Sequence, residues 1–418
     1  MSEYLKPVPI YLADRQVQKK FFTPGVIVLC IIVLNGLLFL AARFLFGIGS
    51  VTNLNNQFPW GIWIGIDVAA GVALAAGGFT SAALGHIMHR EHFHSIVRPA
   101  LLTAMLGYTF VAIGVFVDIG RWYYIWHPLV MWNGNSALFE VGICVMMYVT
   151  VLYIEFLPVV TERFIGKVNL KGYLSFFNKP LEKLLRILDK GLNKTIFIFI
   201  ILGVVLSTLH QSSLGTLMVI AGSKMHPLWQ TPVLPLLFLL SAISVGFPMV
   251  IFESITASKS LGLKKEMEVL SPLGYTVAPL LGIYLAFKIG DMFIRETFVY
   301  LTELNTASIM FTIEVVIGII IPLRMFLSKK VLKTPSLLFT ASALVIFGVL
   351  LNRINNFVVA YTPPYSFGSY FPSIGEISVT VGFVALLVLL YRIIVLNFPV
   401  ISQPDKKFVI KTKYTIKG

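Results

Sequence analysis

The sequence has 418 residues, of which 57% are hydrophobic and only 12% are charged, and its mean hydropathy is +0.85. This composition indicates a polytopic membrane protein and excludes a soluble domain with a large core. The Lys and Arg residues behind the net charge of +14 are spread over alternate loops, so the charge does not indicate nucleic-acid binding. Cys30 and Cys144 lie in apolar segments and form no Cys-x-x-Cys motif, so we expect no disulfide and no iron–sulfur cluster in this chain.

The N-terminal arm, residues 1–23, is polar and basic and lacks the pattern of a cleavable signal peptide. Hydropathy then predicts an all-α integral membrane domain over residues 24–398, followed by a basic tail over 399–418. Ten apolar segments in this domain have roughly 20 residues or more, enough to cross a hydrocarbon core of ~30 Å. The predicted spans are 24–47, 59–85, 97–119, 136–160, 195–222, 231–257, 270–293, 308–328, 335–358 and 374–398.

Basic residues cluster in the loops on one side of these spans. The loop over residues 161–194 contains Lys167, Lys171, Lys179, Lys183, Arg186, Lys190 and Lys194. The opposite loops 48–58 and 359–373 contain no Lys or Arg. Cytoplasmic loops are enriched in these residues, so we expect both termini in the cytoplasm and the protein in the inner membrane. Within the basic loop, residues 180–190 are amphipathic and are expected to lie on the cytoplasmic surface.

The outer loops are rich in aromatic residues, above all residues 121–132 and the segment around Trp229. The aromatic belt of membrane interfaces is a sufficient explanation for them. Two alternatives stay open, namely the entry of a lipid-like aromatic ligand and a docking surface for an extracytoplasmic partner.

Span five contains polar residues at 207–213 inside an otherwise apolar segment, and we expect it to end near residues 221–222. His210 is the one histidine placed well inside a predicted span. A polar group in hydrocarbon is costly unless it is paired, so such a residue predicts a functional site. Glu140, at the predicted outer end of span four, is expected to lie near it.

Asp118 and Arg121 are expected at the outer end of span three, on one helix face because they are three residues apart. They could join His210 and Glu140 near the outer surface, or they could form only a neutralised structural pair. Tyr108 lies on the same span.

Asp67, Glu155 and Glu253 are expected deeper and toward the cytoplasm. A chain of carboxylates could carry protons between the two faces of the membrane. The alternative for the two glutamates is that they extend to the cytoplasmic interface. Gly71, Gly77 and Gly78 in span two are predicted to allow close helix packing.

A histidine cluster follows span two, at His86, His89, His92 and His94. We interpret it as part of an interfacial polar loop and not as a metal site. A membrane b-type haem usually needs two axial histidines that face each other from different spans. His210 has no such mate at its depth, so we expect no haem.

Several polar motifs occur in order along the chain. They are residues 58–67 (Phe-Pro-Trp-Gly-Ile-Trp-Ile-Gly-Ile-Asp), 97–102 (Val-Arg-Pro-Ala-Leu-Leu), 118–121 (Asp-Ile-Gly-Arg), 139–140 (Phe-Glu), 155–158 (Glu-Phe-Leu-Pro), 162–163 (Glu-Arg), 210–215 (His-Gln-Ser-Ser-Leu-Gly) and 226–230 (His-Pro-Leu-Trp-Gln). With them the chain resembles the NrfD/polysulfide-reductase membrane-subunit family over roughly residues 20–400. Within this family it is most similar to the HybB-type membrane subunits of periplasmic nickel–iron hydrogenases. Residues 251–253 and 370–372 match more weakly.

The resemblance implies two four-helix bundles, formed by spans two to five and six to nine. It implies no redox cofactor in this chain, and a site for menaquinone or ubiquinone near the periplasmic side. It also implies two periplasmic partners, an iron–sulfur subunit with four ferredoxin-like clusters and a catalytic subunit such as a hydrogenase.

The resemblance also implies roles for particular residues. Glu140 matches the family's acid at the quinone, and His210 lies in its most recognisable polar motif. The carboxylates of the family's proton route match Asp67, Glu155 and Glu253.

We therefore expect a quinone-binding subunit that passes electrons between a periplasmic iron–sulfur protein and the quinone pool. His210 and Glu140 would form hydrogen bonds and exchange protons, while Asp118, Arg121 and Tyr108 would position the quinone. The alternative is a secondary transporter, because ten spans with buried carboxylates also fit that class. A transporter predicts helix breaks in paired positions, and the breaks expected near Gly222 and Pro248 are not paired. A cytochrome b is a third interpretation and predicts a haem absorption band.

Overall fold

The computed structural model describes residues 12–83, 93–263, 266–364 and 366–404, and its regular structure is almost entirely helical. Ten helical segments among these residues are long and apolar enough to cross a membrane, which confirms the ten predicted spans. They are Pro24–Phe46, Trp63–Ala82, Ser95–Asp118, Ala137–Phe164, Lys194–Lys224, Leu234–Leu261, Met267–Ile294, Thr306–Phe326, Pro335–Val359 and Ile374–Asn397.

Most of the spans are single α-helices. These are α1 (Pro24–Phe46), α4 (His94–Asp118), α5 (Ala137–Phe164), α6 (Asn178–Ala221), α7 (Leu234–Leu261), α8 (Met267–Ile294) and α13 (Ile374–Asn397). The other three contain π-helical turns, a feature that is frequent at functional sites. They are formed by η3 (Trp63–Ala70), α2 (Gly71–Leu74) and α3 (Ala76–Ala82), by α9 (Thr306–Val315), η11 (Val316–Ile320) and α10 (Ile321–Phe326), and by α12 (Pro335–Ile354) and η12 (Asn355–Val359). The short α11 (Lys329–Lys333) lies between the last two groups.

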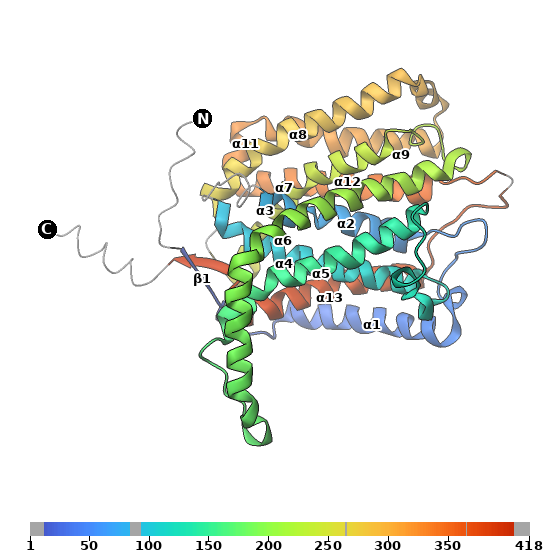
Figure 1. Ribbon diagram of the computed structural model, residues 1–418. Helices are drawn as coiled ribbons and strands as arrows, with labels where there is room; N and C mark the ends of the chain where they lie inside the picture. Colours follow the sequence, from blue (N-terminus) through green and yellow to red (C-terminus); the bar gives the residue numbers. More distant parts are fainter. Residues whose placement is uncertain (1–11, 84–92, 264–265, 365, 405–418) are drawn as a thin grey trace.

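The spans form two four-helix bundles side by side, as the family resemblance implies (Figure 1). In the first bundle α4 contacts α3 and α5, and α5 contacts α6. In the second, α7 contacts α8 and α12, and α12 contacts the π-helical turn η11 of span eight. Contacts of α7 with α3 and α6 join the two bundles. The helices α1 and α13 pack on each other, and α13 contacts α4 at the edge of the first bundle.

Several helix ends follow recognisable capping signals. The Thr23 side chain accepts a hydrogen bond from the backbone at the start of α1, and Ser373 and Glu376 form a capping box at the start of α13. The end of α6 is confirmed at Ala221, because Gly222 adopts a positive φ of 56° that favours glycine. The break expected near Pro248 is wrong, since α7 continues through this residue.

Glycine allows close helix contacts at two places. A Cβ at Gly78 would lie 2.4 Å from the Cβ of Ala104, so span two can approach α4 only with glycine here. The prediction that glycines of span two allow close packing is therefore confirmed. In the second bundle, a Cβ at Gly318 would lie 2.4 Å from the Cα of Gly348, so the backbones of spans eight and nine touch.

Both ends of the described chain lie at one end of the bundles (Figure 1). The strand β1 (Leu12–Arg15) pairs antiparallel with β2 (Ile401–Pro404), with Leu12 opposite Pro404. The two ends must lie on the same side of the bundles, because the number of spans is even. The helix α6 starts at the same end, and its first turns extend sideways past the edge of the bundles before it runs along the other spans (Figure 1).

Candidate functional site

The histidine of span five lies among the aromatic residues of the first bundle. His210 on α6 has no exposed surface, and its ring centroid lies 5.6 Å from that of Tyr108 on α4. Tyr108 contacts Tyr148 of α5 edge to face, with the two ring centroids 4.4 Å apart. Three helices thus meet at this point. The structure brings His210 and Tyr108 together and adds Tyr148, which the sequence analysis missed.

Many of the buried polar atoms around this histidine make no hydrogen bond of ordinary geometry with another described residue. They are both ring nitrogens of His210, Oη of Tyr108, Oγ of Ser207 and Oε1 of Gln211. Gln211 is held by its amide nitrogen, which donates to the Val72 carbonyl at 2.8 Å. Buried polar groups are normally hydrogen-bonded, so a concentration of unpaired ones indicates a place for a polar ligand or for proton exchange.

Glu140 lies beside these residues, in the first turn of α5. Its Oε1 is 3.0 Å from Oγ of Ser213, which is buried on α6 one turn beyond His210. The positive end of the α5 dipole favours a carboxylate at this position. Glu140 is itself exposed, so its contact with Ser213 links the surface of the bundle to the helix turn that carries His210.

Asp118 and Arg121 do not share a helix face, contrary to the prediction. The helix α4 ends at Asp118, and Arg121 is exposed and lies beyond its end. The cation near Asp118 is instead Arg43 of α1, which is 1% exposed. Its Nε donates to the Val117 carbonyl at 2.7 Å and its Nη2 to the Ile119 carbonyl at 2.6 Å. Arg43 therefore caps α4, and the sequence analysis missed it.

Asp67 was expected to group with Glu155 and Glu253, but it lies near Asp118 instead. It accepts a hydrogen bond from Thr380 of α13 at 2.8 Å, and Asp118 is close enough to interact with it electrostatically. Asp118 in turn interacts with Glu376, which accepts a hydrogen bond from the Tyr370 hydroxyl. Burial and this hydrogen bond raise the pKa of Tyr370, which lies outside the spans, so its hydroxyl stays protonated. The expected depth of Asp67 in its span did not predict that Thr380 and Asp118 would be its neighbours.

The other two predicted carboxylates lie at different helix contacts. Glu155 faces α6, where its Oε1 lies 2.6 Å from the position of a Cβ on Gly203. Glu253 of α7 interacts with Thr103 of α4 and Tyr391 of α13. Within the described part of the chain, no hydrogen bond or ion pair joins either glutamate to Asp67.

The second bundle contains a buried ion pair that the sequence analysis missed. Nζ of Lys288 on α8 lies 2.6 Å from Oε1 of Glu314 on α9, and the two side chains are 6% and 1% exposed. Glu314 also accepts hydrogen bonds from Trp229 at 3.0 Å, from Asn352 at 2.8 Å and from Asn355 at 2.7 Å. Trp229 lies between spans five and six, but its ring is buried in the protein and donates to Glu314, so it does not face the lipid.

A third charged residue, Arg353 of α12, completes this cluster and has no exposed surface. Its guanidinium donates to the Asn352 side chain at 2.5 Å and to Ser241 at 2.8 Å, and it lies 3.7 Å from the centre of the Phe238 ring. The signal for Lys288, Glu314 and Arg353 was present in the sequence, because each is a charged residue inside a predicted span.

The predicted histidine cluster cannot be compared with the fold. His86, His89 and His92 lie outside the described residues, and the side chain of His94 is not described. In the described ranges, no group of three or more His, Cys, Asp or Glu side chains is arranged to hold a metal ion. Cys30 and Cys144 are both free, as expected.

Known proteins resemble this chain over most of its length. A family model described as "Polysulphide reductase, NrfD" matches residues 50–364, which include spans two to nine. The chain is 33% identical over 371 residues to the "Probable Ni/Fe-hydrogenase 2 b-type cytochrome subunit" of Escherichia coli, covering 87% of this chain and 89% of the relative. It is 27% identical over 383 residues to the "Menaquinone reductase, integral membrane subunit" of Nitratidesulfovibrio vulgaris, covering 85% and 86%. It is 24% identical over 418 residues to a selenate reductase subunit of Mesobacillus selenatarsenatis, covering 92% and 95%.

Proposed function

Because this chain belongs to the NrfD polysulphide reductase family, we propose that it is the quinone-binding membrane subunit of a respiratory oxidoreductase complex. It exchanges electrons between a periplasmic iron–sulfur subunit and the menaquinone or ubiquinone pool of the inner membrane, with both of its termini in the cytoplasm. The names of its relatives, which include a menaquinone reductase and a hydrogenase, support this proposal. The observation that carries it is the set of buried polar atoms around His210, next to Glu140, that make no hydrogen bond of ordinary geometry among the described residues.

The chemistry of a quinone fits this set of residues. Its carbonyl oxygens need hydrogen-bond donors, and its reduction needs groups that exchange protons. His210 and Tyr108 supply buried donors that make no hydrogen bond of ordinary geometry among the described residues. Glu140 supplies a carboxylate at the bundle surface, where a lipid-soluble molecule arrives from the bilayer. We therefore assign hydrogen bonding and proton exchange to His210 and Glu140, and positioning to Tyr108.

Asp118 and Arg121 have a smaller part in this proposal than the sequence analysis gave them. No hydrogen bond, ion pair or ring contact joins either residue to His210, Tyr108 or Glu140 in the described ranges. We place them at the outer rim of the quinone site, where they act on its electrostatic potential and not through contact.

A proton route from this site is supported best along the contact between α5 and α6. Ser207 of α6 interacts with Tyr148, and Glu155 follows Tyr148 by two helix turns on α5. These side chains offer successive proton donors and acceptors from His210 toward the end of the bundle that carries the basic loop. Glu253 and Asp67 would belong to further branches of the route, at other helix contacts.

The site is proposed to work without haem in this chain. Among the described residues, His210 is the one histidine within a candidate span, while His127 and His226 lie in loops. A bis-histidine haem requires two.

The loop before α5 supports the presence of a periplasmic partner. Its side chains Leu129, Val130, Met131 and Trp132 are all exposed. A contiguous apolar surface of this kind is typical of a docking site for another protein. We propose that the iron–sulfur subunit covers this surface. A catalytic subunit, which is a hydrogenase or another oxidoreductase, binds in turn to the iron–sulfur subunit.

The alternative of a secondary transporter has less support. Its paired helix breaks would lie in corresponding spans of the two bundles. The π-helical turns occur in spans two, eight and nine, and in a repeat of four spans the second would correspond to the sixth. Span six is the continuous helix α7.

Quinone reduction by the complex in liposomes tests the proposal. We expect Glu140→Gln and His210→Ala to lose most turnover while the complex stays assembled and no haem band appears. The control is Glu303→Gln, which removes an exposed carboxylate from the loop between α8 and α9 and should leave turnover unchanged. Unchanged turnover in both test variants would mean that these residues only hold helices together, and the assignment would have to be abandoned.

A further inference from the structure

The segment that precedes span five has a surface that the proposed function does not use. Residues 178–193 form the first part of α6, before the apolar stretch that begins at Lys194. This part is ~24 Å long at 1.5 Å per residue. It extends sideways from the edge of the bundles (Figure 1). A helix at this angle, at the end of a group of spans, has the geometry of a helix that lies in the membrane interface.

An open groove of about 660 Å³ runs along this helix. Its walls include the basic residues Lys179, Lys183, Arg186 and Lys190. They follow one another along the helix at spacings of four, three and four residues, so they lie close together on successive turns. Among the described residues that line it, Glu182 is the only acidic one, so the groove is strongly positive.

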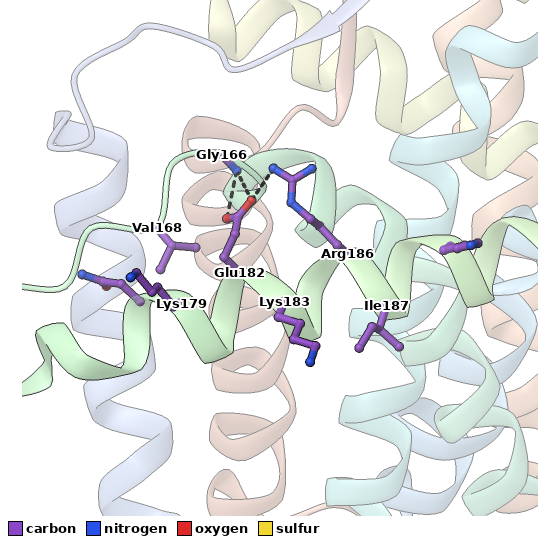
Figure 2. A pocket seen from close by; sticks show the side chains of 9 residues that line it. Gly166, Val168, Lys179, Glu182, Lys183, Arg186 and Ile187 are labelled. Carbon is purple, nitrogen blue, oxygen red and sulfur yellow. Dashed lines mark hydrogen bonds and ion pairs between the residues drawn. The ribbon is translucent and has the colours of Figure 1, made fainter.

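Three of the four positive charges in the groove are free to bind an anion. Arg186 is neutralised, because its Nη2 lies 2.7 Å from Oε1 of Glu182. Glu182 also accepts from the Gly166 backbone N–H at 3.0 Å. Figure 2 shows this Gly166–Glu182–Arg186 contact on one side of the helix, and Lys183 on the opposite side. The lysines at 179, 183 and 190 make no ion pair within the described residues.

Apolar side chains are exposed next to these lysines. Ile187 projects on the same side of the helix as Lys183 in Figure 2, and Ile187 and Leu184 are 60% and 51% exposed. Leu185 and Leu192, which are seven residues apart, are buried on another face of the helix. The helix therefore has one face toward the protein and another that combines free ammonium groups with exposed aliphatic groups.

We propose that this groove binds an anionic phospholipid. The lysines at 179, 183 and 190 hold its phosphodiester headgroup, and the acyl chains lie along Leu184 and Ile187. The positive charge selects an anionic headgroup, and the exposed aliphatic side chains require an apolar ligand portion that a free phosphate or an acidic peptide lacks. Lysine binds phosphate as a point charge and needs no fixed geometry, which suits an open groove. This inference does not depend on the proposed quinone site.

Native mass spectrometry of the purified full-length protein, supplied with equal amounts of phosphatidylglycerol and phosphatidylcholine, tests this inference. We expect bound phosphatidylglycerol to fall at least tenfold in the triple variant Lys179→Gln, Lys183→Gln, Lys190→Gln, because each lysine near an anionic surface contributes roughly fivefold. The matched control removes three exposed lysines of α11 at 329, 330 and 333, and it should keep its lipid. Binding to the wild type should also weaken as salt is added.

Three results would overturn the proposal. The triple variant could keep its phosphatidylglycerol within twofold of the wild type, or the control could lose as much. Phosphatidylcholine could bind the wild type equally well. Inorganic phosphate at millimolar concentration could displace the lipid, which would make the groove a site for free phosphate. Thermal unfolding of each variant is recorded on the same sample, and all three substituted lysines are exposed, so a folding defect is separated from loss of binding.

Discussion

Replacing Lys288 by methionine should destabilise the second bundle by about 3 kcal/mol. Removing one partner of a buried ion pair costs about 3–5 kcal/mol, because the other charge remains buried and uncompensated. Glu314 would keep its hydrogen bonds from Trp229, Asn352 and Asn355, so the cost should lie at the lower end of this range.

Removal of the other partner, Glu314, should cost more unfolding free energy. Glu314→Leu leaves Lys288 and Arg353 as two buried cations without an anion, and it removes the acceptor of three neutral donors. Each unpaired donor adds about 1–3 kcal/mol, so we expect a loss of about 5 kcal/mol or more. For a double-mutant cycle we use Glu314→Gln in place of Glu314→Leu. The double variant Lys288→Met, Glu314→Gln should be much less destabilised than the sum of the single variants Lys288→Met and Glu314→Gln, because neither charge of the pair is left.

Equilibrium unfolding in mixed detergent micelles, followed by circular dichroism, measures these free energies. The matched control is Lys224→Met, which removes an exposed lysine just beyond the end of α6 and should be neutral. The reasoning would be refuted if Lys288→Met cost less than about 1 kcal/mol, or if the double-variant cycle were additive.

Two further predictions concern helix packing and pH. Gly318→Ala should cost about 1–3 kcal/mol of unfolding free energy because its Cβ would overlap the Gly348 backbone, whereas Gly282→Ala, which meets nothing within 4 Å, should be neutral or stabilising in the same unfolding assay. Burial lowers the pKa of His226 from 6.5, and its Nδ1 accepts a hydrogen bond from the Leu228 N–H, so the folded state favours neutral imidazole. The unfolded state then binds more protons as the pH falls below about 6.5, so the Tm of the wild type should drop there more than that of His226→Gln, and equal drops would contradict this.

The ten spans and the position of His210 inside one of them could be predicted from the sequence because both depend on local patterns. Hydropathy over about 20 residues identifies a span, and a histidine within it is noticeable without knowledge of its neighbours. The glycines of span two are a similar case, since small residues indicate close approach whichever helix approaches.

The partners of the charged residues could not be predicted in this way. Asp118 was assigned to Arg121, three residues away, but its cation is Arg43, which is 75 positions earlier in the sequence. Glu314 is bound by Lys288, Asn352 and Trp229 from three other parts of the chain. Such pairs depend on which spans are neighbours, and hydropathy carries no information about that order.

The contact between α1 and α13 has a consequence for biosynthesis. The first of the ten spans packs mainly against the tenth, and β1 and β2 also pair near the two ends of the described residues. Only 11% of the most apolar part of α1 is buried in the finished protein, so this helix has few other contacts to hold it. Because α1 precedes both bundles in the chain and α13 follows them, α1 cannot make this contact until the helices of both bundles have been synthesised. Loss of α13 would therefore leave α1 without the helix that makes most of its contacts.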